Sequence, residues 1–307
     1  MKILNYGSLN IDHVYHVPHF VRPGETLSSL DMQLFAGGKG LNQSIALARA
    51  GADVWHAGAI GKDGGMLSGI LKDSNVNTGC LKIRDVPTGH AIIQIDENGQ
   101  NCILLYGGAN QTMNRLEIEE VLSHFEEGDI LLLQNEINEL GTIMELAFRR
   151  GLKIYLNPSP MNEIIHELPL SYVDCFLLNE VEAADICGVG EDEALAVLHD
   201  RFPKAELVLT LGSKGAVCMT GERVFHQDSF PVEAVDTTAA GDTFTGFYIS
   251  AVASGKDTAL ALREAAAAAA IAVSRAGAAA IAVSRAGAAP SIPVYDEMAA
   301  FLKQMQG

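Results

Sequence analysis

The second half of the chain alternates between short apolar runs and segments of helical length. This order, which is regular from Asp129 onward, is typical of β-strands joined by crossover helices, and strands joined in that way pair in parallel. The alternation therefore predicts an α/β fold built on a mostly parallel sheet. The expected strands are Ile130 to Leu133, Lys153 to Leu156, Cys175 to Leu178 and Leu207 to Leu211, with helices near 138–150, 161–167 and 190–200.

Polar residues follow the ends of these predicted strands. In an open α/β sheet, ligands bind at the carboxyl ends of the strands. A helix cap would explain any one of these residues, whereas the whole row indicates a ligand site. The row consists of Asn135, Glu136, Asn157, Asn179, Glu182, Thr210 and Gly212.

The N-terminus adds another strand to this pattern. Lys2 to Gly7 reads as a strand, and a polar cluster that contains Asn10 and Asp12 follows it. Their side chains suit hydrogen bonds to sugar hydroxyls, although turn chemistry of the Asx type explains them equally well.

A small second sheet is expected outside the main one. Apolar and polar residues alternate from Thr26 to Leu34 with the period of a half-buried strand. His90 to Asp96 and Asn101 to Tyr106 are its expected partners. We expect a lid from about 13–35 and 88–107 within a single domain, 1–307, and its apolar face suits pairing with a second copy of the chain.

Two glycine-containing turns precede predicted helices. Ala36 to Asn42 (AGGKGLN) leads into a helix from Gln43 to Ala50, but it lacks the spacing of a Walker loop, and a structural turn explains it nearly as well. Asp236 to Phe244 (DTTAAGDTF) precedes a helix from Phe244 to Ala253. Its small residues, Ala239 to Gly241, lie where free backbone N–H groups and the helix dipole attract anions. An acid at the edge of a phosphate cradle is what a kinase needs.

The composition of the chain limits which classes of binding partner and which compartment we expect. A net charge of −17 argues against a nucleic acid or an anionic membrane as the main partner. The five cysteines show no paired or metal-ligand spacing, which predicts buried free thiols in a reducing compartment. No signal peptide is evident and the alanine-rich tract is broken by charges, so we expect a cytoplasmic protein.

A ten-residue segment occurs twice in succession near the C-terminus. AAIAVSRAGA fills 269–278 and again 279–288. Ten residues added to one continuous helix would rotate everything beyond them to roughly 80° short of three full turns. Alternatively, the glycines Gly277 and Gly287 end the helix twice or let one copy loop out.

Together, these motifs resemble those of the ribokinase family of carbohydrate and nucleoside kinases. The similarity runs from Asn5 to Pro293, and its two signatures are Ala36 to Gly51 and Asp236 to Phe244. The resemblance implies a three-layer α/β sandwich with a small β-sheet lid that often forms a dimer. It also implies transfer of the ATP γ-phosphate to a sugar hydroxyl, which is O5 if the sugar is ribose.

The resemblance assigns roles by matching motif. Asp242 would be the base, and the backbone of Ala239, Ala240 and Gly241 would hold the phosphoryl charge. Asn179 would reach the nucleotide phosphates, and Glu182 would order Mg²⁺ and its water. The sugar contacts would be Asn10, Asp12, Gly38, Lys39, Asn42, Glu136 and Asp242 itself. The nucleotide pocket would be lined by Thr210, Gly212, Ser213 and Gly215, and Gly241 would also contact the nucleotide.

Members of this family are also activated by a monovalent cation, usually K⁺. The matching residues are Asp236, Thr238 through its carbonyl, and Ser291. The other carbonyls fall in the repeat, and either copy supplies them. One set is Ala272, Arg275 and Gly277, and the other, favoured by adjacency to Ser291, is Ala282, Arg285 and Gly287.

Two alternatives remain at this point. The acceptor is another pentose, a ketohexose or a nucleoside, or the chain is a catalytically weak sugar sensor. The intact Asp242, Gly241, Asn179 and Glu182 argue against a sensor, which needs no base.

Overall fold

The computed structural model describes residues 1–275 and 288–305 of the chain. Within these residues one large sheet has nine strands, of which the seven from β11 to β5 pair in parallel with one another, while β12 and β13 pair antiparallel at one edge. The α/β class predicted from the alternation is confirmed. In spatial order the strands are β13 (Arg223–Gln227), β12 (Ala216–Thr220), β11 (Glu206–Thr210), β10 (Val173–Asn179), β9 (Lys153–Asn157), β8 (Ile130–Gln134), β1 (Ile3–Tyr6), β4 (Val54–Gly61) and β5 (Asn77–Arg84).

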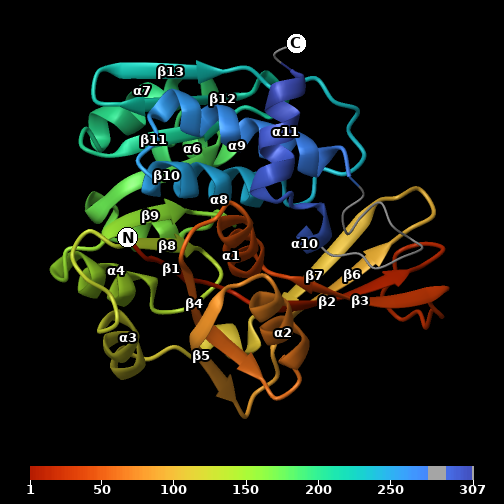
Figure 1. Ribbon diagram of the computed structural model, residues 1–307. Coiled ribbons are helices and arrows are strands. Elements are labelled where there is room, and N and C mark those ends of the chain that lie inside the picture. The colour runs from red at the N-terminus through yellow and green to blue at the C-terminus, as the bar shows by residue number, and fades with distance from the viewer. Residues whose placement is uncertain (276–287, 306–307) are drawn as a thin grey trace.

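Helices cover both faces of this sheet (Figure 1). One face packs against α1 (Lys39–Arg49), α2 (Gly65–Asp73), α8 (Ala240–Ala253), α9 (Thr258–Val273) and α11 (Tyr295–Gln304). The other packs against α3 (Arg115–Leu122), α4 (Leu140–Arg149), α5 (Ile164–Glu167), α6 (Glu180–Cys187) and α7 (Glu191–Arg201). Successive strand residues serve opposite layers, since Ile130 joins the first core and Leu131 the second. The fold is the expected three-layer sandwich.

A second, smaller sheet projects from one side of the sandwich (Figure 1). Its spatial order is β3 (Asp31–Gly37), β2 (Asn10–His16), β6 (Gly89–Ile95) and β7 (Asn101–Tyr106). The parallel pair β2–β6 lies between two antiparallel pairs, so the sheet is mixed. We refer to it as the lid sheet.

The lid sheet corrects two expectations about the N-terminal region. Strand β6 begins at Gly89, one residue before the expected His90, but β3 starts at Asp31 rather than Thr26. Asn10 and Asp12 lie in a strand, not in a turn after β1. Local sequence does not reveal this, because β2 is defined by pairing with segments that begin about twenty and eighty residues later.

Helices α1 and α8 pack in unusually close contact. A Cβ added to Gly246 would lie 2.4 Å from the Cβ of Ala46 and 2.7 Å from the backbone nitrogen of Leu47. Both helices also begin earlier than their apolar runs suggested, α1 at Lys39 and α8 at Ala240. The first turns of the two helices therefore lie beside each other.

The repeated segment does not form one continuous helix, because α9 ends at Val273 within the first copy. The carbonyl of Val273 accepts hydrogen bonds from the backbone N–H groups of Val235 (2.9 Å) and Asp236 (3.2 Å). Arg275 forms an ion pair with Glu297 of α11 at 2.9 Å. Almost all of the second copy lies outside the described residues, which resume with α10 (Ala288–Ser291).

The cysteines only partly match the expectation of buried thiols. Cys80, Cys175 and Cys218 are buried, whereas Cys187 is half-buried and Cys102 of β7 is exposed. In the described part of the chain, none of the helices combines the length and the apolar character needed to cross a bilayer.

Candidate active site

The candidate site lies where the strand order of the large sheet reverses. From β1 the chain proceeds to β4 on one side, while β8 flanks β1 on the other, which opens a crevice at their carboxyl ends. Ser8 follows β1 and Glu136 follows β8. The Glu136 carboxylate accepts hydrogen bonds from the Ser8 hydroxyl and from the backbone N–H of Lys39, the latter at 3.0 Å. These bonds tie the crevice to the start of α1.

The lid sheet brings two polar side chains to this crevice. The side-chain oxygen of Asn10 accepts a hydrogen bond from Asn110 at 2.8 Å, and Asn110 in turn accepts one from the backbone N–H of Leu9 at 3.0 Å. Asp12 lies against the backbone of Gly37, where an added Cβ would be 2.1 Å from a carboxylate oxygen. Neither Asn110 nor Ser8 was identified from sequence as a site residue, since no spacing links them to the motifs they support.

Burial shifts the ionisation of both acids in the crevice. Desolvation, with a smaller contribution from the Glu136 charge, raises the pKa of Asp12 to about 7. Burial also raises the pKa of Glu136, although the hydrogen bonds from Ser8 and Lys39 partly oppose the shift. Both carboxylates in the crevice are therefore poorly solvated, and a hydrogen-bond donor placed there would stabilise their charged forms.

The turn before α8 is built for close approach of a ligand. Ala239 adopts a left-handed conformation with φ of 61°, and the helix starts at the next residue. A Cβ added to Gly241 would meet no atom within 4 Å, so packing does not explain this glycine. The first turn of a helix also leaves backbone N–H groups without helical partners. These features are those of a turn that can bind an anion, as the sequence predicts, and Gly241 leaves open space beside it.

Asp242 sits in the first turn of α8 and is only 8% exposed. One carboxylate oxygen accepts a hydrogen bond from the Asn42 side chain at 3.0 Å, and the other accepts one from Gln43 at 2.9 Å. The close contact of α1 with α8 thus places both amides at the predicted base.

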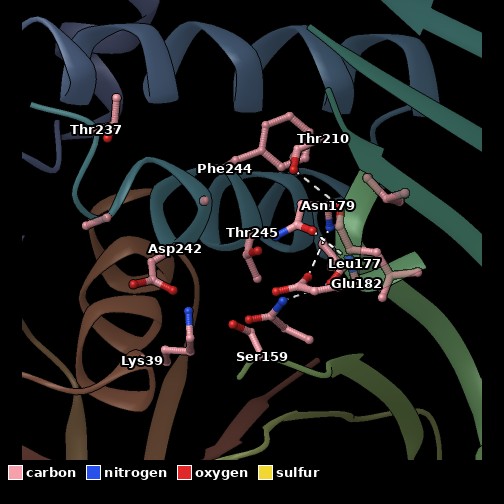
Figure 2. Close-up of a pocket in the computed structure, with 15 residues that line it drawn as sticks. Lys39, Ser159, Leu177, Asn179, Glu182, Thr210, Thr237, Asp242, Phe244 and Thr245 are labelled. Carbon is pink, nitrogen blue, oxygen red and sulfur yellow. Dashed lines mark hydrogen bonds between the residues drawn. The ribbon is translucent and has the colours of Figure 1, made fainter. Parts of the chain in front are cut away.

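A cavity of about 240 Å³ opens beside this turn. Figure 2 shows Lys39 and Asp242 on one side of it and Asn179 and Glu182 on the other. A second cavity of about 510 Å³ adjoins the first and shares Thr210, Thr237, Gly241 and Phe244 with it. The anion turn therefore borders both cavities.

The second cavity is lined mainly by small and apolar residues. It includes the predicted nucleotide residues Thr210, Gly212, Ser213 and Gly215, together with Phe230 and the alanines of α9. Gly215 has φ of 100°, and a Cβ there would lie 2.0 Å from the carbonyl oxygen of Gln227. Its walls suit a flat, largely apolar ring.

Asn179 and Glu182 form a capping box at the start of α6. The Asn179 side chain accepts from the Glu182 N–H at 2.8 Å, and the Glu182 carboxylate accepts from the Asn179 N–H at 3.0 Å. Both residues also line the first cavity. The helix-cap interpretation and the ligand interpretation therefore apply to the same pair.

Among the described residues, no group of three or more His, Cys, Asp or Glu side chains is placed to hold a metal ion. Mg²⁺ needs no such group, because it is usually bound by one or two carboxylates and by the phosphates of its ligand. Glu182, an oxygen donor lining the cavity, fits that requirement.

The predicted monovalent-cation residues are only partly described. Asp236 is buried and accepts a hydrogen bond from the Thr238 N–H at 2.8 Å, and Ser291 is buried in α10. In the first copy, the carbonyl of Ala272 accepts from the Arg275 N–H at 3.2 Å. The remaining predicted residues, Gly277, Ala282, Arg285 and Gly287, lie outside the described residues.

Comparisons with known proteins agree with this geometry. The model of the pfkB family of carbohydrate kinases matches residues 1–285. A ribokinase of Haemophilus influenzae is 35% identical over 97% of both chains. The structure of Arabidopsis thaliana ribokinase complexed with ribose and ATP superposes with a TM-score of 0.84, at 28% identity over 98% of both chains. A deoxyribokinase of Salmonella typhi is 29% identical over 90% of this chain and 94% of its own.

The raised pKa of Asp12 predicts a pH-dependent stability. Because the folded pKa, about 7, lies above the unfolded value of 3.8, the charged carboxylate opposes folding, and stability is lost as pH rises from about 4 to 7. We expect Asp12→Asn to melt a few degrees above the parent protein at pH 8 and at the same temperature near pH 4. Thermal unfolding monitored by circular dichroism across this range measures the difference. A difference that stays constant with pH would contradict the prediction.

Proposed function

The chain belongs to the pfkB family of carbohydrate kinases, and from this premise we propose that it transfers the γ-phosphoryl group of ATP to a sugar hydroxyl. It is a phosphotransferase with an alcohol acceptor, and ribose is the best-supported acceptor. One observation carries the mechanism: a buried carboxylate, Asp242, stands at an anion turn that borders two adjoining cavities. An acceptor on one side and a nucleotide on the other would meet there.

The acceptor would bind in the crevice under the lid sheet. Carboxylates and amides are well suited to a polyhydroxylated ligand, because each hydroxyl both donates and accepts a hydrogen bond. Gly38, with φ of 96°, lets its backbone lie close to Asn10, since an added Cβ would be 3.1 Å from the Asn10 backbone nitrogen. The residues proposed to hold the sugar are Asn10, Asp12, Gly38, Lys39, Asn42 and Glu136.

Transfer needs a proton acceptor and a place for the charge of the phosphoryl group. Asp242 takes the proton of the attacking hydroxyl while the new O–P bond forms and the bond between the β- and γ-phosphates breaks, which releases ADP. The backbone of Ala239, Ala240 and Gly241 stabilises the charge that spreads over the phosphoryl oxygens. Open space beside Gly241 lets that group approach.

The nucleotide would occupy the two cavities. We assign its base to the larger cavity, lined by Thr210, Gly212, Ser213 and Gly215, and its phosphates to the smaller one, near Asn179. Mg²⁺ bound to those phosphates would neutralise part of their charge, and Glu182 would hold it, directly or through water.

Asp242→Asn tests the proposed base. The amide keeps the shape of the side chain but cannot accept the hydroxyl proton, so we expect sugar-dependent ADP release to fall by roughly 10²- to 10⁴-fold. Sugar affinity, measured by calorimetry, should change little. Turnover comparable to the parent protein would rule out Asp242 as the base.

The same assay addresses the acceptor. Similarity to a deoxyribokinase makes 2-deoxyribose the second candidate, so both pentoses, a ketohexose and a nucleoside belong in the panel. If none of these compounds raises ATP consumption above background, the result would favour the alternative that the protein is a catalytically weak sugar sensor.

We also propose a monovalent-cation site at Asp236, Thr238 and Ser291, completed by carbonyls of the repeat. Asp236 is buried beside the turn before α8, and its carboxylate is an oxygen ligand of the kind that hard cations bind. We expect turnover to fall when K⁺ is replaced by Na⁺. Deleting 279–288 provides a matched control, because the identical copies leave one unbroken AAIAVSRAGA before Pro290. Indifference of the full chain to the cation, with a response in the shortened chain, would show that the duplication has spoiled the site.

Finally, we propose that the protein forms a homodimer through the lid sheet. Every residue of β7 is exposed, and the strand lies at an edge of the sheet. Cross-strand pairing aligns Leu34, His13, Ile92 and Leu104 in one row, whose two leucines are 49% and 67% exposed. Large apolar side chains exposed on an edge strand and across one sheet face are typical of interaction surfaces.

Sedimentation measures this association directly. We expect the parent protein to sediment as a dimer and Leu104→Asp as a monomer, because a charge in the row would have to be buried at the interface. A monomeric parent protein would overturn the dimer without affecting the proposed chemistry.

A further inference from the structure

Gln43 connects the proposed base to the large sheet, although no contact with a ligand requires it. It belongs to α1, directly after Asn42, and its side chain is fully buried. Its amide nitrogen donates to the Asp242 carboxylate at 2.9 Å and to the side-chain oxygen of Asn157 at 3.0 Å. Both hydrogens of the amide are therefore used, one of them on the base.

The far end of this amide is held as firmly. Its oxygen accepts a hydrogen bond from Gln134 at 2.6 Å, and the same Gln134 nitrogen also donates to Asn5 of β1 at 3.0 Å. Asn157 is anchored by donating to the backbone carbonyl of Leu177 at 2.9 Å. With its oxygen facing a donor and its nitrogen facing two acceptors, the Gln43 amide has a single satisfied orientation.

We infer that Gln43 is a positioning residue that fixes the Asp242 carboxylate for proton transfer. The inference rests on the proposed function, in which Asp242 is the base. Asn42 secures one carboxylate oxygen and is itself proposed to contact the sugar. Gln43 secures the other oxygen, and strands β1, β8, β9 and β10 hold Gln43 through Asn5, Gln134, Asn157 and Leu177. A carboxylate held at only one oxygen keeps freedom about its terminal torsion, which is broad for Asp.

This role predicts an effect on the reaction step and not on sugar affinity. A displacement of about 1 Å in a reacting group can cost roughly 10²-fold in rate. Because Gln43 is fully buried, it contacts no bound sugar, so losing its hydrogen bond leaves ground-state binding unchanged.

The test is Gln43→Met, which keeps the volume of the side chain and removes its hydrogen bonds. We expect kcat, and the single-turnover rate of sugar-phosphate formation, to fall roughly 10- to 100-fold. KM for the sugar should stay within about twofold, as expected for an interaction that acts only in the transition state.

Ser44→Ala is the matched control. Ser44 is the next residue, equally buried, and it contacts Asn5 at 2.9 Å and His56 at 2.8 Å but not Asp242. The substitution removes a hydrogen-bonding group from the same buried network, so it should lower the melting temperature and leave kcat unchanged.

Gln134→Met is the second variant. It keeps the bond from Gln43 to Asp242 but frees the amide to rotate, so we expect a smaller loss of kcat.

Each outcome decides. Loss of kcat at constant KM in Gln43→Met, with Ser44→Ala unaffected, supports the inference. Unchanged kcat in Gln43→Met, with KM either raised or unchanged, overturns it, and so does an equal loss of kcat in Ser44→Ala. If Gln43→Met does not fold, unchanged kcat in folded Gln134→Met overturns it as well. Failure of the parent protein to phosphorylate any sugar would instead count against the proposed function.

Discussion

The close contact between α1 and α8 is the constraint on which the site depends. Gly246 has no side chain, so the backbones meet where any Cβ would be 2.4 Å from Ala46. Since Gly246 follows Asp242 by one helical turn, this contact sets the distance from Asp242 to Asn42 and Gln43. A larger residue would have to push the helices apart, and the hydrogen bonds of 2.9–3.0 Å would break.

Several groups serve the fold and the proposed chemistry at once. Asn179 and Glu182 cap α6 and line the cavity assigned to the phosphates. The lid strand β2 pairs with β3 and β6 and carries Asn10 and Asp12 into the crevice. Asp12, which we propose as a sugar contact, shows what such a position costs, because burial raises the pKa of its carboxyl to about 7. The charged carboxylate therefore lowers the stability of the fold at neutral pH and above.

The parts of the site that follow from sequence are those encoded locally. Asn157, Asn179 and Thr210 end strands that their apolar runs predicted, and the small residues before Asp242 indicated an anion turn before the helix was located. The two helices begin at Lys39 and Ala240, earlier than the predicted starts at Gln43 and Phe244. The difference arises because the glycine- and alanine-rich first turns carry no apolar periodicity. Ser8, Gln43 and Asn110 escaped notice because their partners lie 32 to 199 positions away along the chain.

The sequence by itself determined the α/β class, the two signature turns and the chemical types of the groups at the strand ends, because apolar period, glycine placement and side-chain chemistry are local properties. Only the tertiary structure decided which of those groups meet. Whether Asn10 belongs to a turn or to a lid strand, and whether Asp242 is held by one amide or two, depends on β pairing and on helix contact across the fold. Such contacts are fixed by packing of the whole core and not by any stretch of residues.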